Sequence, residues 1–159
     1  MPGLEDLYRE IILDHYRNPR NRGELPVPPA HAETGFNPLC GDEITVYLQL
    51  DGDRITDIKL AGQGCSISQS SASMMSTAVK GRTLEEARRV IRTFKGMMSV
   101  HEQRLGGDDD AEATADAVAE LGDLAALQGV VKFPVRIKCA TLSWNTLAQA
   151  LDAVGAAAD

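Results

Sequence analysis

The alternation of apolar and polar residues between positions 44 and 60 constrains the fold more than any other feature. Apolar side chains occupy every second position from Ile44 to Leu50, with less apolar residues between them. A period of two is typical of a β-strand that buries one face. Asp51-Gly52-Asp53 then supplies a turn, and a second apolar run returns over 55–60 with a one-residue break in its alternation. The segment predicts an antiparallel hairpin with a β-bulge in the returning strand.

Helical patterns lie on both sides of this hairpin. Residues 4–12 carry apolar side chains at helical spacing, and Asn18-Pro19 ends that segment because the residue before a proline avoids helical angles. Residues 20–38 predict a polar, Pro-rich connection. After the hairpin, residues 66–80 contain no helix breaker and precede Gly81, so they predict a second helix.

The second half of the chain adds three more segments. Thr83 and Glu86 form a capping-box pattern in front of another amphipathic helix. Residues 106–129 are acidic and rich in alanine, and they predict a short acidic helix on the surface. Apolar positions over 142–151 predict a final helix.

The order of helix, strands and several helices predicts one α+β domain over residues 1–159. A net charge of −7 argues against a nucleic-acid binder, because neutralising phosphates needs a basic face. The sequence has no apolar run near the roughly 20 residues that span a bilayer, and it opens without the pattern of a signal peptide. We therefore expect a cytoplasmic protein that binds neither nucleic acid nor membrane.

Three cysteines, Cys40, Cys65 and Cys139, are the residues best suited to carry chemistry. An odd number argues against a closed disulfide framework. Cys65 and Cys139 each lie at or near a predicted helix start, where unpaired N–H groups stabilise a thiolate. Their spacing matches no C-x-x-C knuckle. From the residues alone, a shared metal site and three buried cysteines that act as small apolar side chains both remain open.

Three motifs in a fixed order resemble the iron–sulfur scaffold superfamily of IscU and NifU N-terminal type. The first runs from Leu7 to Asn21 and includes Asp14-His15-Tyr16-Arg17-Asn18-Pro19. The second is Asn37-Pro38-Leu39-Cys40-Gly41-Asp42, and the third begins Gly62-Gln63-Gly64-Cys65-Ser66 and continues to Met75. The resemblance covers nearly the whole chain. It implies an IscU/NifU-like fold, in which a small antiparallel sheet of about three strands packs against several helices.

The residue before the last cysteine indicates the branch of that superfamily. In the IscU type a histidine normally precedes this cysteine, whereas here the residue is Lys138 in Arg136-Ile137-Lys138-Cys139. A lysine at this position resembles the SufU type, which also carries extra residues between the second and third cysteines. The acidic segment 106–129 is where we expect the extra residues.

The resemblance to SufU-type proteins implies a function. It implies that Cys40, Asp42, Cys65 and Cys139 bind zinc, and thiolates with one carboxylate are an acceptable tetrahedral zinc set. The positive charges of Lys138 and Arg136 would offset part of the negative charge. Cys40 would accept persulfide from a SufS-type cysteine desulfurase and relay it to downstream cluster assembly proteins. The expected activity is that of a zinc-dependent sulfurtransferase.

Two other readings stay open. The same ligands could carry iron or a [2Fe–2S] cluster, since thiolates suit both iron–sulfur clusters and zinc. A purely structural zinc site in an interaction module is a further alternative, and in that case removal of the metal would unfold the protein.

The three histidines are not expected to be metal ligands. His15 continues the apolar row of the first helix, so we expect it to be packed or to cap the helix. His31 lies in the Pro-rich connection, and His101 lies in a predicted loop.

Overall fold

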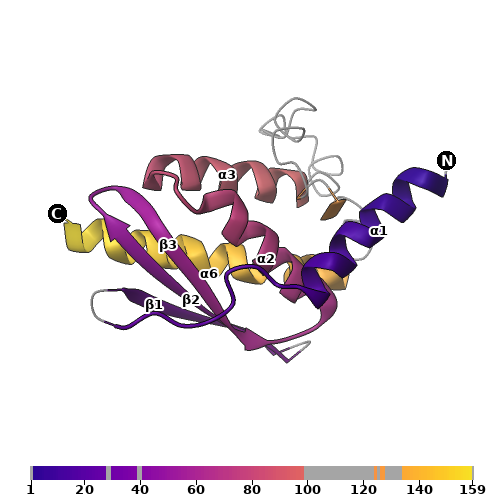
Figure 1. Ribbon diagram of the computed structural model, residues 1–159, viewed down its shortest axis with the longest axis horizontal. Helices are drawn as coiled ribbons and strands as arrows, with labels where there is room; N and C mark the ends of the chain where they lie inside the picture. The colour runs from indigo at the N-terminus through magenta and orange to yellow at the C-terminus, as the bar shows by residue number, and fades with distance from the viewer. Residues whose placement is uncertain are drawn as a thin grey trace.

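The computed structural model describes residues 2–27, 30–38, 41–98, 124, 126–127 and 134–158. A three-stranded antiparallel sheet has the order β1-β2-β3, with β1 over His31–Asn37, β2 over Asp42–Asp51 and β3 over Arg54–Gln63. The helices are α1 over Pro2–Arg17, α2 over Ser66–Val79, α3 over Leu84–Met98 and α6 over Pro134–Ala158. The predicted α+β class with about three strands is confirmed (Figure 1).

The predicted hairpin is β2 and β3, and its register shows the predicted bulge. Gln49 lies opposite Asp57 but Leu50 lies opposite Ile55, so Thr56 is an extra residue in the returning strand. The extra residue restores the alternation, so that Ile55 and Ile58 are both completely buried. The one-residue break in the sequence pattern is therefore a β-bulge.

Strand β1 lies within the segment 20–38 that the sequence pattern assigned to a connection, so that assignment was wrong for residues 31–37. The strand is an edge strand that pairs only with β2, from His31 opposite Leu48 to Asn37 opposite Asp42. Its residues do not alternate cleanly between buried and exposed. At Gly35 a Cβ atom would collide with the side chain of Thr146 in α6, so glycine allows this helix to pack closely on the strand.

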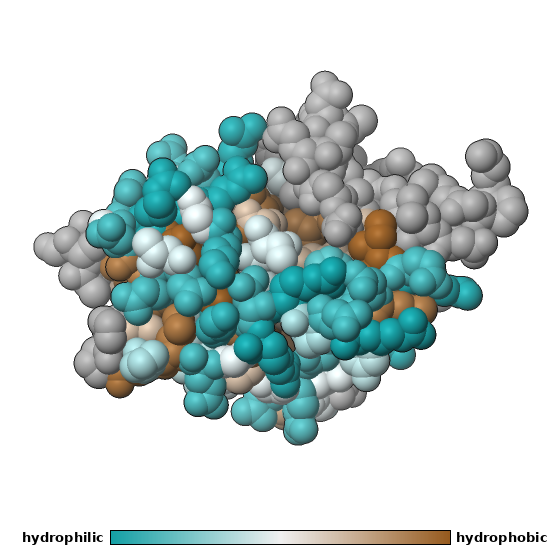
Figure 2. All heavy atoms as spheres, viewed as in Figure 1, coloured by the Kyte–Doolittle hydropathy of each residue, from teal (hydrophilic) through white to brown (hydrophobic). Residues whose placement is uncertain are grey.

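Helices α2, α3 and α6 cover one face of the sheet in two layers (Figure 1). Helix α6 packs against β1 and β2, α2 packs against β3, and α3 packs over α2 and α6 (Figure 1). Phe94 of α3 stacks on Trp144 of α6 with ring centroids 4.2 Å apart, and both side chains are completely buried. Stacked aromatic pairs add to the free energy gained by burial. Figure 2 shows one face of the molecule, which is mostly hydrophilic, with apolar side chains visible in small patches.

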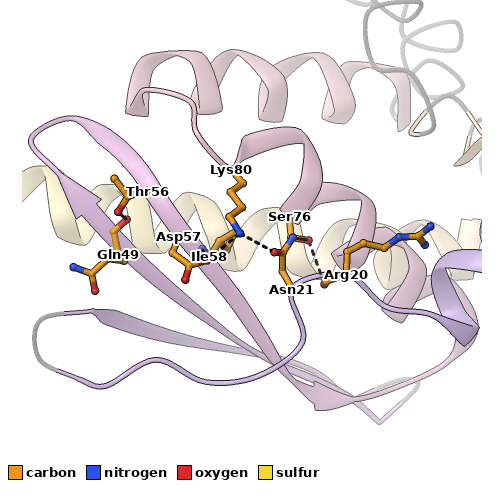
Figure 3. Close-up of polar contacts among 8 residues, drawn as sticks. All are labelled: Arg20, Asn21, Gln49, Thr56, Asp57, Ile58, Ser76 and Lys80. Carbon is orange, nitrogen blue, oxygen red and sulfur yellow. Dashed lines mark hydrogen bonds and ion pairs between the residues drawn. The ribbon is translucent and has the colours of Figure 1, made fainter.

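The start of the segment between α1 and β1 is tied to the rest of the fold by polar side chains (Figure 3). Asn21 has a positive φ of 58° and donates a hydrogen bond from Nδ2 to Ser76 Oγ in α2. Lys80 Nζ lies 3.3 Å from Asn21 Oδ1 and 3.4 Å from Asp57 Oδ1 of β3. Backbone hydrogen bonds join Asn21 and Gly23 to Leu60, so this segment covers part of the outer edge of β3.

The capping box in front of α3 is present as predicted. Thr83 N–H donates to Glu86 Oε1 at 3.0 Å, and Glu86 N–H donates to Thr83 Oγ1 at 3.1 Å. These bonds from Thr83 lower the pKa of the Glu86 carboxyl group. The reciprocal bonds satisfy two N–H groups that the helix start would leave unpaired.

Most of the predicted acidic insertion, residues 106–129, lies outside the described residues. Within it the structure describes Leu124, Ala126 and Leu127, and all three are buried. The single-domain boundary and the insertion therefore stay predictions. Among the described residues, no helix combines the length and apolar character that crossing a membrane needs.

Candidate metal centre

Asp42, Cys65 and Cys139 come together at one end of the sheet. Asp42 is the first residue of β2, Cys65 immediately precedes α2, and Cys139 lies near the start of α6. One ligand atom from each residue lies within 4.8 Å of the other two. Asp42 and Cys139 are almost completely buried, and Cys65 is half-buried. Figure 1 shows the starts of α2 and β2 at the same end of the sheet.

The carboxylate of Asp42 is fixed by the backbone of Cys65. Its Oδ1 accepts a hydrogen bond from the N–H group of Cys65 at 2.9 Å, and its Oδ2 lies 4.0 Å from Cys65 Sγ. A Cβ atom at Gly64 would lie 2.6 Å from Asp42 Oδ1, so a glycine is needed for the chain to pass this close. One carboxylate oxygen is thus held by the protein, while the other lies beside a sulfur atom.

Cys65 is the N-cap residue of α2. Its Sγ accepts a hydrogen bond from the N–H group of Ser68 at 3.5 Å, and Ser68 Oγ donates back to the carbonyl oxygen of Cys65 at 3.1 Å. The sulfur therefore occupies the position that a Ser or Asp oxygen takes at most helix starts. The positive end of the helix dipole stabilises negative charge at this atom.

Cys139 lies near the start of α6, as the sequence pattern indicated, but it is not at the helix terminus itself. Helix α6 begins at Pro134, so Cys139 lies about a turn and a half inside it, beyond the N–H groups that a helix start leaves unpaired. Proline at the first helical position explains this early start, since its missing N–H group is not needed there. The sulfur instead accepts a hydrogen bond from Asn37 Nδ2 of β1 at 3.9 Å.

A cationic side chain also approaches both sulfur atoms. The pKa of the Arg136 guanidinium group is raised by the negative charge of Cys65 and then by a hydrogen bond with Cys139. Arg136 lies on the first turn of α6, and it is exposed to solvent. Lys138 is exposed too, and within the part of the chain that the structure describes its side chain makes no hydrogen bond or ion pair with the cluster.

The other sequence candidates lie elsewhere or outside the described residues. Cys40 and His101 are outside them. His15 is buried between α1 and α2, where Nδ1 lies 2.8 Å from Ser73 Oγ. His31 Nε2 lies 3.1 Å from Glu33 Oε1.

The donor set suits a borderline-soft divalent cation. Tetrahedral zinc with Zn–S bonds near 2.3 Å places its sulfur ligands about 3.8 Å apart, so atoms within 4.8 Å need only a small inward movement. Two thiolates and one carboxylate carry a formal charge of −3, which favours a cation. Hard ions such as Mg²⁺ prefer oxygen ligands alone. The described residues therefore fit zinc or iron.

Two contributors to the site were missed by sequence reasoning. Asn37 was recognised only as the first residue of a family motif, and Ser68 was not singled out at all. Ser68 lies three residues after Cys65, which is the spacing of an N-cap acceptor and its N–H donor. That spacing could have been used, whereas the contact between Asn37 and Cys139 joins residues far apart in the sequence.

Comparisons with known proteins identify the family of this chain. The model of the NifU-like N terminal domain family matches residues 7–140. The zinc-dependent sulfurtransferase SufU of Bacillus subtilis is 48% identical over 144 residues, which cover 91% of this chain and 88% of the relative. The iron–sulfur cluster assembly scaffold protein IscU of Streptococcus pyogenes is 40% identical over 148 residues, covering 93% of this chain and 84% of that protein.

A solved structure has the same fold. It is a protein of Fervidobacterium islandicum described as an iron–sulfur cluster assembly scaffold for the SUF system. The two chains superpose with a TM-score of 0.73 at 36% identity, over 89% of this chain and 94% of the other. The resemblance predicted from three short motifs is therefore confirmed over nearly the whole length.

Proposed function

We propose a function from the premise that this chain belongs to the NifU-like N terminal domain family. It is an iron–sulfur cluster assembly protein that accepts persulfide sulfur from a cysteine desulfurase onto Cys40 and relays it to cluster assembly. The observation that carries this proposal is the cluster of Asp42, Cys65 and Cys139 in a chain 48% identical to a zinc-dependent sulfurtransferase. The reducing cytoplasm, which keeps thiols free, suits this chemistry.

Zinc is the cofactor that we assign to this site, with Cys40 as the fourth ligand beside Asp42, Cys65 and Cys139. Cys40 lies two residues from Asp42 in the sequence, and the contacts of Asp42 hold that end of β2 at the cluster. When bound, zinc would keep the thiols deprotonated at neutral pH. Four anionic ligands around a divalent ion leave a formal charge of −2, which Arg136 partly offsets.

The sulfur transfer itself is a thiol exchange that needs no oxidant. The Cys40 thiolate attacks the outer sulfur of a persulfide on the partner, a new S–S bond forms at Cys40, and the S–S bond of the partner breaks. The partner's cysteine leaves as a thiolate. Cys40 is the best candidate because Cys139 is buried and Cys65 is engaged as the cap of α2.

Turnover of the cognate cysteine desulfurase tests this function directly. Sulfide or alanine production is measured with and without this protein, using zinc-loaded and metal-stripped samples. Strong stimulation that requires zinc supports a zinc-dependent acceptor. No stimulation, together with binding of iron and acid-labile sulfide, would instead support the scaffold function that the name of the Streptococcus relative states.

Replacing Cys40 with alanine is expected to abolish sulfur acceptance. Without the thiolate no S–S bond can form, so sulfane sulfur on the protein should fall to the background of a sample without desulfurase. Mass spectrometry after incubation with desulfurase and cysteine measures this, and far-ultraviolet circular dichroism checks that the fold is retained. A variant that still collects persulfide would remove Cys40 from this role.

Phe36 is the residue that we expect to anchor the desulfurase. It is the neighbour of Asn37 at the site end of β1, and 61% of its surface is exposed. Since the persulfide must reach this end of the sheet, the partner would cover the ring. Anchoring aromatic residues contribute more than about 1 kcal/mol, so Phe36→Ser should raise the concentration needed for half-maximal stimulation about 10-fold.

The matched control for this prediction is Val27→Ser. Val27 is similarly exposed, at 56%, but it lies before β1 and away from the ligand residues in the sequence. Zinc content should be unchanged in both variants. Equal effects of the two substitutions, or none at Phe36, would place the desulfurase on another surface.

A further inference from the structure

We propose that Asn37 is a positioning residue for the metal centre, which holds the Cys139 sulfur in its ligand position through an amide N–H···S hydrogen bond. This inference rests on the proposed metal site and adds a residue outside its ligand set. Asn37 Nδ2 lies 3.9 Å from Cys139 Sγ, at the long end of the range for a hydrogen bond to sulfur, and both residues are buried. The contact crosses 102 positions of the sequence.

The position of Asn37 is set by strand pairing in the sheet and not by its contact with Cys139. It is the last residue of β1 and lies opposite Asp42, the first residue of β2, in the antiparallel register. The same register that places the Asp42 carboxylate at the cluster therefore places the amide of Asn37 there. Side chains of directly opposed residues lie on the same face of a sheet, which here is the face covered by α6.

Cys139 needs such a donor more than Cys65 does. Cys65 Sγ accepts the Ser68 N–H group at a helix start, whereas Cys139 lies inside α6, past the unpaired N–H groups. A buried anionic sulfur without a donor is costly, because burial removes the water that would solvate it. The neutral amide supplies a hydrogen bond without adding charge, and together with Arg136 it gives Cys139 a donor from each of two elements.

The hydrogen bond has a consequence that can be measured in the metal-loaded protein. A donor to a ligating sulfur lowers the energy of its lone pairs, so sulfur-to-metal charge transfer needs more energy. Loss of the donor should therefore move this transition of the cobalt-substituted protein to longer wavelength. Removal of a hydrogen bond that orients a ligand typically lowers metal affinity by about 10- to 100-fold.

The test compares the intact protein with Asn37→Leu, whose side chain branches at the same position, is larger and has no donor. Cobalt(II) spectra and zinc competition against a chromophoric chelator are the two readouts. We expect the charge-transfer band to shift to longer wavelength and the zinc dissociation constant to rise about 10- to 100-fold. Asn37→Ala serves as a second variant if leucine does not fit.

Ser143→Ala is the matched control. Ser143 is a buried polar residue one turn after Cys139 on α6, and its Oγ has no hydrogen-bond partner among the described residues. It should change neither readout. If the Asn37 variants bind zinc more weakly but show no shift of the charge-transfer band, Asn37 has a structural role only, and the hydrogen-bond proposal is overturned. It is overturned as well if neither the band nor the zinc dissociation constant changes. Because neither readout involves desulfurase, failure of sulfur transfer would not be mistaken for failure of this inference.

Discussion

Replacing Cys65 with serine is expected to abolish tight zinc binding while helix α2 keeps its start. A serine hydroxyl accepts N–H hydrogen bonds well and is a preferred N-cap residue, so the bond from Ser68 would be retained. As a metal ligand it is poor, because it would have to lose a proton that it holds far more tightly than a thiol does. We expect zinc affinity to fall at least about 100-fold.

Cys65→Ala separates the two roles of this residue. Alanine can neither bind zinc nor cap the helix. Without metal, the free energy of unfolding of Cys65→Ala should therefore be about 1 kcal/mol lower than that of Cys65→Ser. Urea unfolding of metal-free samples measures this difference, and chelator competition measures zinc. Equal stabilities of the two variants would exclude the capping role, and tight zinc binding by either would remove Cys65 from the ligand set.

Trp144→Ala is the substitution with the largest expected effect on stability. The side chain is completely buried, stacks on Phe94 and donates from Nε1 to Ser71 Oγ at 3.0 Å. Truncation of a buried aromatic side chain to alanine leaves a cavity and typically costs about 3–5 kcal/mol. That is a large fraction of the free energy of unfolding of a domain this size. Thermal or urea unfolding of the intact protein and of Trp144→Ala measures this loss of free energy of unfolding.

The hydrogen bond of Trp144 also links the two helices that carry Cys65 and Cys139. Ser71 of α2 accepts from Trp144 and donates to the carbonyl oxygen of Ala140, the residue after Cys139, at 2.6 Å. Trp144→Phe keeps most of the stacking and removes this donor, so it should cost about 1–3 kcal/mol. A phenylalanine variant as unstable as the alanine variant would show that the hydrogen bond, and not the packing, is dominant.

The parts of the fold that the sequence predicted well are those with a local repeating signal. The hairpin, its bulge and the capping box at Thr83 follow from side-chain spacing within a few residues, and the structure contains all three. Strand β1 lacks such a signal, because an edge strand packed closely by a helix at Gly35 buries its residues irregularly. Residues 31–37 form a strand because they pair with β2 and pack against α6, and their own side-chain pattern does not indicate it.

The same distinction applies to the metal centre. Family motifs singled out Asp42, Cys65 and Cys139, and the structure brings these three together. The environment of each sulfur was not predictable, since it depends on which element lies beside it in space. Helix α2 shows this clearly, because five of its serines are buried, and apolar spacing alone could not indicate that polar residues would face the core. The buried serines are Ser68, Ser70, Ser71, Ser73 and Ser76.

The assembly of the cluster from β2, α2 and α6 makes metal occupancy a measure of native structure. In an unfolded chain, bringing Asp42 and Cys139 together would cost the entropy of closing a long loop, so the proposed zinc ion would bind the folded state more tightly than the unfolded chain. By mass action, free zinc at 1,000 times its dissociation constant adds about 4 kcal/mol to the free energy of unfolding. The lifetime of the folded protein would then depend on the concentration of free zinc around it.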